Sequence, residues 1–385
     1  MIYLFYISFI ILFYTYIGYG IIVKLCTFFI KKTILIPQKD TLLPEITHII
    51  ACFNEEKIIH KKIENSISLN YPNEKLKTIF VTDGTTDKSM KILSSFPSVI
   101  NYHANERKGK LDAVNRVIED IQTEIIVFSD ANSFLNKMAL RNISIHFQDV
   151  TIGAVAGEKK VLSDNKDDAA AAGEGLYWKY ESWLKKMDYH LFSVVGAAGE
   201  LFAIRAKLYQ KPNANLLIED FITSMNVTKN GYRVAYASDA IASEKASVSI
   251  EEEIKRKIRI SAGGLQAVLH LRGLLNVFRY GVLSFQYISH RVLRWTLAPL
   301  ALVIFFLSNL LLFESTLIFK IFFVCQVFFY LLSIVGYFFK KSRIKFKIAF
   351  VPFYFTLMNL SVFIGFYKLI SGDFKVTWDK AKRRY

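Results

Sequence analysis

Long apolar runs lie at both ends of the 385-residue chain, and a stretch of mixed polar and apolar residues separates them. Residues Ile2 to Ile30 carry one charge, Lys24. At about 1.5 Å per residue this run is long enough to cross about 30 Å of hydrocarbon. It lacks a basic start and a small-residue cleavage site, which favours a retained anchor over a cleaved signal peptide. Lys31 and Lys32 follow and predict that the next segment faces the cytosol. Residues 1–32 are therefore expected to form a transmembrane anchor.

The C-terminal third predicts about three further spans within residues 295–372. The apolar runs are Trp295–Phe313, Thr316–Phe339 and Ile348–Ile370. A basic cluster at 340–347 separates the last two and should face the cytosol. The basic tail at 373–385 also prefers the cytosol. A single span between the cluster and the tail would place them on opposite sides of the membrane. Either the last segment re-enters the membrane or the number of spans differs by one.

The segment Phe278–Arg294 precedes the first of these runs and mixes large apolar side chains with basic ones. Such a pattern is typical of an amphipathic helix lying in the membrane interface. The alternative is that it forms the cytosolic start of a longer spanning helix.

Between the apolar ends, residues 44–275 alternate between short apolar runs and helical patterns. The runs Ile46–Ala51, Leu76–Thr82 and Glu124–Ser129 predict strands, with helices between them. This order predicts an α/β domain with a parallel sheet covered by helices, and ligands bind beyond the carboxyl ends of such strands. The polar residues at those ends are Asn54, Glu55, Asp83 and Asp130. They predict a binding site there.

The amino-acid composition and net charge restrict the classes of molecule that the chain is expected to bind. Hydrophobic residues make up 52% of the chain and the mean hydropathy is +0.28, in keeping with membrane spans. The net charge of +16 fits nucleic acid, an anionic membrane face or a phosphorylated substrate. No basic stretch is interleaved with stacking aromatics, so nucleic acid is disfavoured. Three cysteines without metal-ligand spacing indicate a reduced, cytosolic domain. Neither a dinucleotide-binding fingerprint nor a P-loop follows the first strand.

Four sequence segments carry a resemblance to a known family. They are IIACFNEEKIIHKKIENSISLNYP at 49–72, IFVTDGTTDKS at 79–89, ERKGKLDAVN at 106–115 and VFSDANS at 127–133. Their order and spacing resemble family 2 glycosyltransferases with a GT-A fold. They are most similar to the membrane-bound polysaccharide synthases that make cellulose, chitin, hyaluronan and poly-N-acetylglucosamine. The resemblance covers about residues 44–275 and implies a nucleotide-sugar transferase flanked by transmembrane helices.

The resemblance implies a donor site. Asp83 would contact the uridine of the nucleotide and Glu55 would lie beside the base and ribose, because a carboxylate accepts hydrogen bonds from base N–H groups and hydroxyls. Asp130 and Asn132 stand where the family has Asp-x-Asp, and imply Mg2+ or Mn2+ bridging the diphosphate. Asn132 supplies one charge fewer than the usual second Asp. Lys108 and Lys110 would offset diphosphate charge, unless they belong to a solvated loop.

The resemblance also implies an acceptor side. Gly196 and Gly199 resemble a glycine-bearing acceptor loop, with a structural turn as the alternative. Glu219 and Asp220 resemble the acidic pair that supplies the general base, with Asp220 as the base.

The resemblance implies that Arg256 and Arg259 help to bind the diphosphate: Arg259 matches the Arg of the family's Gln-x-x-Arg-Trp motif, which holds diphosphate and acceptor, and Arg256 stands at the Gln position. In this chain Ile260 replaces the Trp, so stacking of an acceptor sugar on that ring is lost. The alternative for the two arginines is a basic patch that faces the membrane.

Together these features predict a multi-pass enzyme of the cell membrane with a cytosolic catalytic domain. It would transfer a sugar from a nucleotide-sugar, with UDP favoured, to a growing glycan in cell-surface polysaccharide synthesis. One alternative is single-sugar transfer to a lipid or polyprenyl-phosphate acceptor. Another, from a different class, is a catalytically inactive membrane scaffold.

Overall fold

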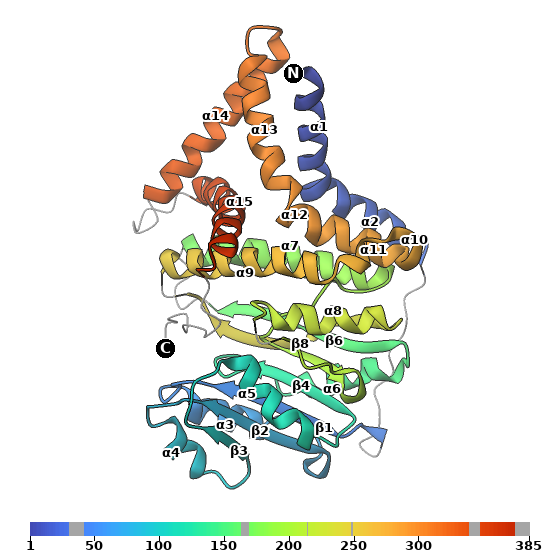
Figure 1. Ribbon diagram of the computed structural model, residues 1–385, viewed down its shortest axis with the longest axis vertical. Helices are drawn as coiled ribbons and strands as arrows, with labels where there is room; N and C mark the ends of the chain where they lie inside the picture. The colour runs from blue at the N-terminus through green and yellow to red at the C-terminus, as the bar shows by residue number, and fades with distance from the viewer. Residues whose placement is uncertain (31–41, 163–168, 214, 248, 339–346, 374–385) are drawn as a thin grey trace. The chain divides into compact units, whose positions relative to one another are not determined.

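The computed structural model describes residues 1–30, 42–162, 169–213, 215–247, 249–338 and 347–373 (Figure 1). The chain divides into two compact units. The sheet unit comprises residues 42–162 and 188–246, and the helical unit takes up the remaining described residues. The basic segments predicted at 31–32 and 340–346, and nearly all of the tail, lie outside the described residues.

One mixed sheet organises the sheet unit, and in the described ranges its strand order is β3-β2-β1-β4-β7-β6-β8-β5. Neighbours among β1, β2, β3 and β4 pair in parallel, as do β6 and β8, whereas β7 runs antiparallel to both β4 and β6. The strands are β1 (Ile46–Cys52), β2 (Leu76–Asp83), β3 (Ile100–Ala104), β4 (Ile125–Asp130), β5 (Phe134–Leu135), β6 (Ile152–Leu162), β7 (Phe202–Arg205) and β8 (Arg233–Lys245). The predicted parallel sheet is therefore half of a larger mixed one.

Both faces of the parallel half are buried, which explains why its strands are apolar at successive positions. Ile49 and Val81 pack on one face with Val114 of α5 (Lys110–Val117). Ile50 and Phe80 pack on the other face with residues of α3 (Ile59–Ile67) and α4 (Ser89–Ser94). Figure 1 shows α5 and the α3–α4 pair on opposite sides of these strands. The remaining helices of this unit are α6 (Ala139–Ser144) and α8 (Glu219–Lys229).

The helical unit contains the apolar ends of the chain. Its helices are α1 (Ile2–Phe13), α2 (Tyr19–Thr27), most of α7 (Ala169–Leu191), α9 (Ile250–His270), α10 (Val277–Tyr280), α11 (Val282–Tyr287), α12 (Leu293–Trp295), α13 (Leu297–Leu311), α14 (Leu317–Phe338) and α15 (Lys347–Ser371). A buried ion-pair cluster ties this unit together. The carboxylate of Glu181 in α7 pairs with Arg291, at 3.1 Å, and with Arg294. Because Glu181 is fully buried, these two guanidinium groups compensate a charge that water cannot reach.

Three described helices are long and apolar enough to cross a membrane: Ile2–Thr27, Leu317–Phe338 and Ile348–Ser371. They coincide with three of the four spans that the sequence predicts. The predicted run Trp295–Phe313 is shorter as a helix. It forms α13, bent by 55° from the helical segment Val282–Trp295. A fourth crossing exists only if this bent pair is one broken span.

The segment predicted as an interfacial helix, Phe278–Arg294, is helical but interrupted. Gly281 separates α10 from α11 with φ +50°, a backbone conformation that favours glycine. Phe278, in α10 before this break, is almost fully exposed. Whether the segment lies on a membrane surface stays a prediction.

Candidate active site

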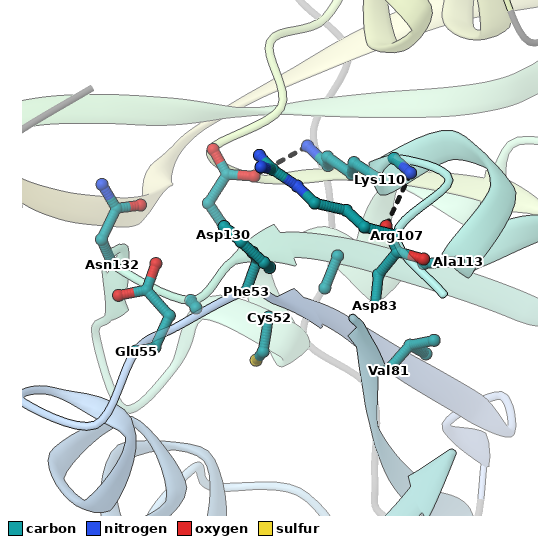
Figure 2. Close-up of a pocket in the computed structure, with 13 residues that line it drawn as sticks. Cys52, Phe53, Glu55, Val81, Asp83, Arg107, Lys110, Ala113, Asp130 and Asn132 are labelled. Atoms are coloured by element: carbon teal, nitrogen blue, oxygen red, sulfur yellow. Dashed lines mark hydrogen bonds and ion pairs between the residues drawn. The ribbon is translucent and has the colours of Figure 1, made fainter. Parts of the chain in front are cut away.

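A pocket opens where β1, β2 and β4 end (Figure 2). The last residue of each of these strands, Cys52, Asp83 and Asp130, lines it. Glu55, Lys110 and Asn132 contribute further polar side chains. Glu55, Asp83 and Asp130, three of the four polar residues predicted at the strand ends, therefore line one concave surface, because parallel strands deliver their carboxyl ends to the same edge of the sheet.

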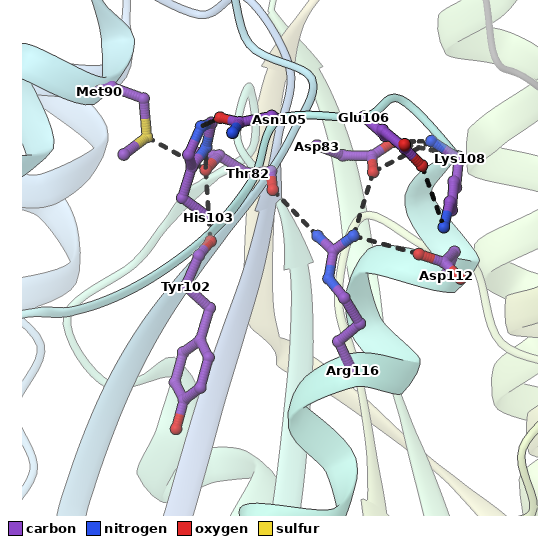
Figure 3. Close-up of polar contacts among 11 residues, drawn as sticks. Thr82, Asp83, Met90, Tyr102, His103, Asn105, Glu106, Lys108, Asp112 and Arg116 are labelled. Atoms are coloured by element: carbon purple, nitrogen blue, oxygen red, sulfur yellow. Dashed lines mark hydrogen bonds and ion pairs between the residues drawn. The ribbon is translucent and has the colours of Figure 1, made fainter.

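The carboxylate of Asp83 holds the loop that precedes α5 (Figure 3). It accepts hydrogen bonds from the backbone N–H groups of Lys108, at 3.1 Å, and Gly109, at 2.6 Å. The guanidinium of Arg116 adds a third donor at 3.4 Å and also donates to the carbonyl of Thr82. Asp83 is buried and lines the pocket as well. It therefore has an organising role beside the nucleotide contact that the sequence predicts.

Two glycines allow this loop to approach Asp83. Gly84 has φ +61°, and a Cβ at that position would lie 2.6 Å from Cβ of Arg107. Gly109 has φ +103° and immediately precedes α5. Because side chains at both positions would be strained, the loop geometry depends on glycine.

The ammonium of Lys110 joins Asp130 in the pocket to the acidic pair at the start of α8. Its Nζ lies 2.7 Å from Oδ1 of Asp130 and 3.5 Å from Oε1 of Glu219. All three side chains are largely buried, at 16–20% exposure. Burial alone would lower the pKa of Lys110, but the carboxylates of Asp130, Glu219 and Asp220 outweigh it and raise that pKa. Lys110 is therefore a fixed cation at this site.

Asp220 lies in the same cluster with an altered proton affinity. Burial, together with the neighbouring Glu219 carboxylate, raises the pKa of Asp220 to about 7, and Lys110 partly opposes this shift. Oδ1 of Asp220 accepts a hydrogen bond from the backbone N–H of Phe221 at 2.8 Å. A carboxylate with a pKa near neutrality is suited to accept a proton during a reaction.

The predicted glycine loop lies beside this carboxylate. A Cβ at Gly199 would lie 3.1 Å from both Oδ2 of Asp220 and Nζ of Lys110, so the backbone there approaches both groups closely. Gly196 has φ +81°, and a Cβ there would clash with the ring of Phe221 at 2.1 Å. Both glycines therefore have a steric reason to be glycine, and an acceptor role stays a prediction.

A family model described as "Glycosyltransferase like family 2" matches residues 44–263, more than half of the chain. The chain belongs to glycosyltransferase family 2. The match contains the whole pocket and the Lys110 cluster, and extends into α9.

Curated relatives are distant and longer than the matched region. The probable glycosyltransferase YdaM of Bacillus subtilis (strain 168) is 24% identical over 249 residues, which cover 59% of this chain and 57% of that protein. The poly-beta-1,6-N-acetyl-D-glucosamine synthase of Staphylococcus aureus (strain COL) is 23% identical over 237 residues, covering 59% and 56%. The beta-monoglucosyldiacylglycerol synthase of Nostoc sp. is 28% identical over 165 residues, covering 41% and 34%. The chain thus spans about half or less of the length of these relatives.

Among solved structures, the chain resembles the mannosyltransferase PcManGT from Pyrobaculum calidifontis, determined in complex with GDP-Man and Mn2+. The TM-score is 0.70 at 18% identity, and the match covers 95% of this chain and 99% of that chain. This similarity shows the fold: a GT-A domain with the flanking helices. The fold predicted from the sequence is confirmed.

The pocket of this family 2 chain has ligands for part of a divalent-cation site. Asp130 and Asn132 line it together and offer carboxylate and amide oxygens, the ligand types that Mg2+ and Mn2+ accept. In the described part of the chain, no three His, Cys, Asp or Glu side chains cluster as a metal cage. Mg2+ is commonly held by one or two carboxylates plus substrate phosphates. The residues therefore fit a cation whose coordination the donor diphosphate completes.

Some predicted site residues lie elsewhere. The side chain of Lys108 is 59% exposed and pairs with Glu106, so only its backbone N–H contacts Asp83. Asn54 has φ +51°, and its side chain bonds to the backbone N–H of Thr86. Neither Lys108 nor Asn54 is among the described residues that line the pocket.

Arg256 and Arg259 belong to α9 of the helical unit, which is distinct from the unit that forms the pocket. Nε of Arg256 lies 3.1 Å from Oε2 of Glu253, one turn earlier in the same helix. A role of these arginines in diphosphate binding stays a prediction.

The pocket also uses residues that were not predicted from the sequence. The guanidinium of Arg107 lies 3.8 Å from the centre of the Phe53 ring, and both side chains line the pocket. This cation–π contact places an aromatic ring and a guanidinium together in the pocket wall. The signal was an aromatic residue two positions after the predicted strand Ile46–Ala51. Lys62 was not predicted either, and it lies outside the set of described residues that line the pocket. It is fully buried in α3, which lowers its pKa to about 7 although Cys52 and Asp130 act to raise it.

Proposed function

We propose that this chain is an inverting glycosyltransferase that transfers a sugar from a nucleotide diphosphate donor, UDP-linked, to a hydroxyl of a growing glycan. The observation that carries the proposal is the position of Lys110 between Asp130 and Glu219, next to Asp220. This arrangement combines a cation for a diphosphate with a carboxylate that accepts a proton, and the displacement of a diphosphate by a hydroxyl needs both.

The donor would bind in the pocket. Asp83 and Glu55 accept hydrogen bonds from the base and ribose, and Arg107 with Phe53 offers a flat surface beside them. Lys110, whose Nζ lies 2.7 Å from Oδ1 of Asp130, would offset the negative charge of the diphosphate. A divalent cation held by Asp130 and Asn132 would supply charge compensation for the departing nucleotide diphosphate. The solved relative with GDP-Man and Mn2+ supports this cofactor class.

In the reaction, Asp220 would remove the proton of the acceptor hydroxyl as that oxygen attacks the anomeric carbon. The new glycosidic bond forms as the bond from this carbon to the diphosphate oxygen breaks, and the electron pair leaves with the nucleotide diphosphate. Glu219 keeps Asp220 proton-accepting by raising its pKa, and Lys110 prevents that rise from going further. Gly196 and Gly199 would let the acceptor sugar approach this carboxylate.

The apolar helices support placement of the enzyme in a membrane. Three described helices have the length and composition of spans, and the Staphylococcus relative is a polysaccharide synthase. Positive charge after the first span and between the last two favours a cytosolic catalytic unit in the cell membrane, next to a lipid bilayer.

A second candidate is transfer of one sugar to a lipid acceptor. Ile260 stands where the polymer-forming family members have Trp, and the Nostoc relative is a glycolipid synthase. An experiment that supplies labelled UDP-sugars, one at a time, to membranes containing the full chain distinguishes polymer synthesis from transfer of a single sugar. A ladder of products supports polymer synthesis, and a single lipid-bound sugar supports the second candidate. No transfer from any UDP- or GDP-sugar with Mg2+ or Mn2+ contradicts both and leaves the inactive scaffold.

A further inference from the structure

Lys62 is a charged residue that lies entirely inside the sheet unit. Its side chain, on α3, is 0% exposed. Neighbouring Lys61 on the same helix is exposed. A buried ammonium is strongly unfavourable unless hydrogen-bond acceptors surround it, so a lysine at this position needs a specific set of partners.

The partners of Lys62 flank the proposed metal ligands on both sides. Its Nζ donates to Oγ of Ser129 at 2.9 Å and to the carbonyl oxygen of Ser133 at 2.5 Å. Ser129 immediately precedes Asp130, and Ser133 immediately follows Asn132. The ammonium therefore spans the base of the turn that carries both ligands.

Two further side chains extend this support. Asn65, one turn after Lys62 on α3, donates to the carbonyl oxygen of Leu135 and accepts from its backbone N–H, both at 2.8 Å. Nε2 of His48, on β1, lies 2.8 Å from Oγ of Ser129. The strand before the turn and the segment after it are thus fixed by buried or half-buried side chains behind the pocket.

We propose that Lys62, assisted by Asn65, is a positioning residue for the Asp130–Asn132 turn, and that it sets the affinity of this turn for a divalent cation and a nucleotide diphosphate. The inference rests on the proposed function, because it takes Asp130 and Asn132 as the metal ligands. Groups that orient metal ligands from behind typically change metal affinity by about 10–100-fold when they are removed.

The sign of the effect separates positioning from simple electrostatics. Positive charge behind Asp130 opposes the approach of a cation, so a lysine that acted only through its charge would weaken metal binding. Its removal would then tighten Mn2+ binding. A lysine that acts by holding the turn has the opposite effect, and its removal weakens Mn2+ binding.

The test measures Mn2+ binding to the purified full-length chain by electron paramagnetic resonance, with and without UDP. Lys62→Met retains side-chain length but removes the hydrogen bonds, and we expect it to weaken Mn2+ binding at least about tenfold. Lys61→Met makes the same charge change on the exposed side of α3 and should leave the Mn2+ affinity within about twofold of wild type. Unchanged or tighter Mn2+ binding in Lys62→Met overturns the proposal.

A second variant covers the case in which Lys62→Met does not fold. Asn65→Leu removes both bonds to Leu135 without touching a buried charge, and we expect it to weaken Mn2+ binding about threefold or more. Wild-type affinity in Asn65→Leu then overturns the proposal. Failure of the proposed function looks different: the wild-type chain itself would bind neither Mn2+ nor UDP, which rejects both ideas. Binding by wild type with no effect of the variants rejects the positioning role alone.

Discussion

The ammonium of Lys110 lies 2.7 Å from the carboxylate of Asp130, and the same nitrogen lies 3.5 Å from Glu219. Asp130 ends a strand, whereas Glu219 begins a helix some 90 residues later. Lys110 therefore couples the part of the site that would hold the donor diphosphate to the part that would activate the acceptor. Because Lys110 contacts both parts of the site, its loss should affect both of them.

Lys110→Met should lower kcat/KM by about 100-fold, because a charge-assisted donor aimed at the leaving group is lost. The pH at which activity is half-maximal should also rise, since Lys110 no longer opposes the raised pKa of Asp220. Steady-state rates against pH measure both effects. Lys91→Met removes an exposed lysine on α4 and serves as the matched control. Its kcat/KM and its pH of half-maximal activity should equal those of wild type.

The activity of the wild-type enzyme should rise with pH and level off above neutrality. The pKa of Asp220 is raised to about 7, and only the deprotonated carboxylate accepts a proton. The logarithm of kcat/KM should therefore increase with unit slope below about pH 7. A profile that is flat between pH 5 and 8 would show that Asp220 is not the group whose ionisation controls the reaction.

Asp220→Asn should stabilise the protein at alkaline pH. The folded-state pKa of Asp220 lies above the ordinary value of 3.8, so the folded state binds the proton more tightly than the unfolded state. This tighter proton binding by Asp220 stabilises the folded state fully below about pH 4, and the stabilisation is lost as pH rises through about 7. We expect the melting temperature of Asp220→Asn to exceed that of wild type by about 2 °C or more at pH 8. At pH 5 the difference should be smaller. Thermal unfolding of both proteins at the two pH values checks this.

Gly84→Ala should raise the KM for the donor about tenfold or more. Its Cβ would lie 2.6 Å from Cβ of Arg107 and 2.9 Å from backbone atoms of that residue, so the loop must move away from Asp83. Gly231→Ala is the matched control. Gly231 also has positive φ, +83°, but a Cβ there meets nothing within 4 Å. An equal rise in donor KM in both variants would mean that backbone strain in general, rather than this loop, controls donor binding.

The sequence allowed strands β1, β2 and β4 of the parallel half to be predicted because their signals are local, whereas β3 was not predicted. Each of these three strands is a mostly apolar run of six to eight residues, and β2 and β4 end on the polar residues Asp83 and Asp130. The other half of the sheet, strands β5 to β8, was not predicted. Strands β6 and β8 pair across about 80 residues, and their register is set by tertiary packing that no short window contains.

The same limit applies to the polar side chains of the site: local sequence identifies single residues but not the contacts between distant ones. Asp130, Glu219 and Asp220 could be named from motifs, but their junction through Lys110 depends on how distant segments fold together. Lys62 was not found because a lysine in a polar-looking helix usually points to solvent. Only its two acceptors, 67 and 71 residues away along the chain, explain its burial.

The central claim is that Asp220, next to Lys110 at the pocket, performs the chemistry, and that the pocket binds the donor independently of Asp220. The most direct measurement compares wild type and Asp220→Asn for transfer of labelled sugar from the UDP-sugar that raises the wild-type melting temperature most. The account predicts that the variant loses at least about 100-fold in transfer rate while that UDP-sugar stabilises it as much as wild type. Transfer by Asp220→Asn at the wild-type rate would contradict it.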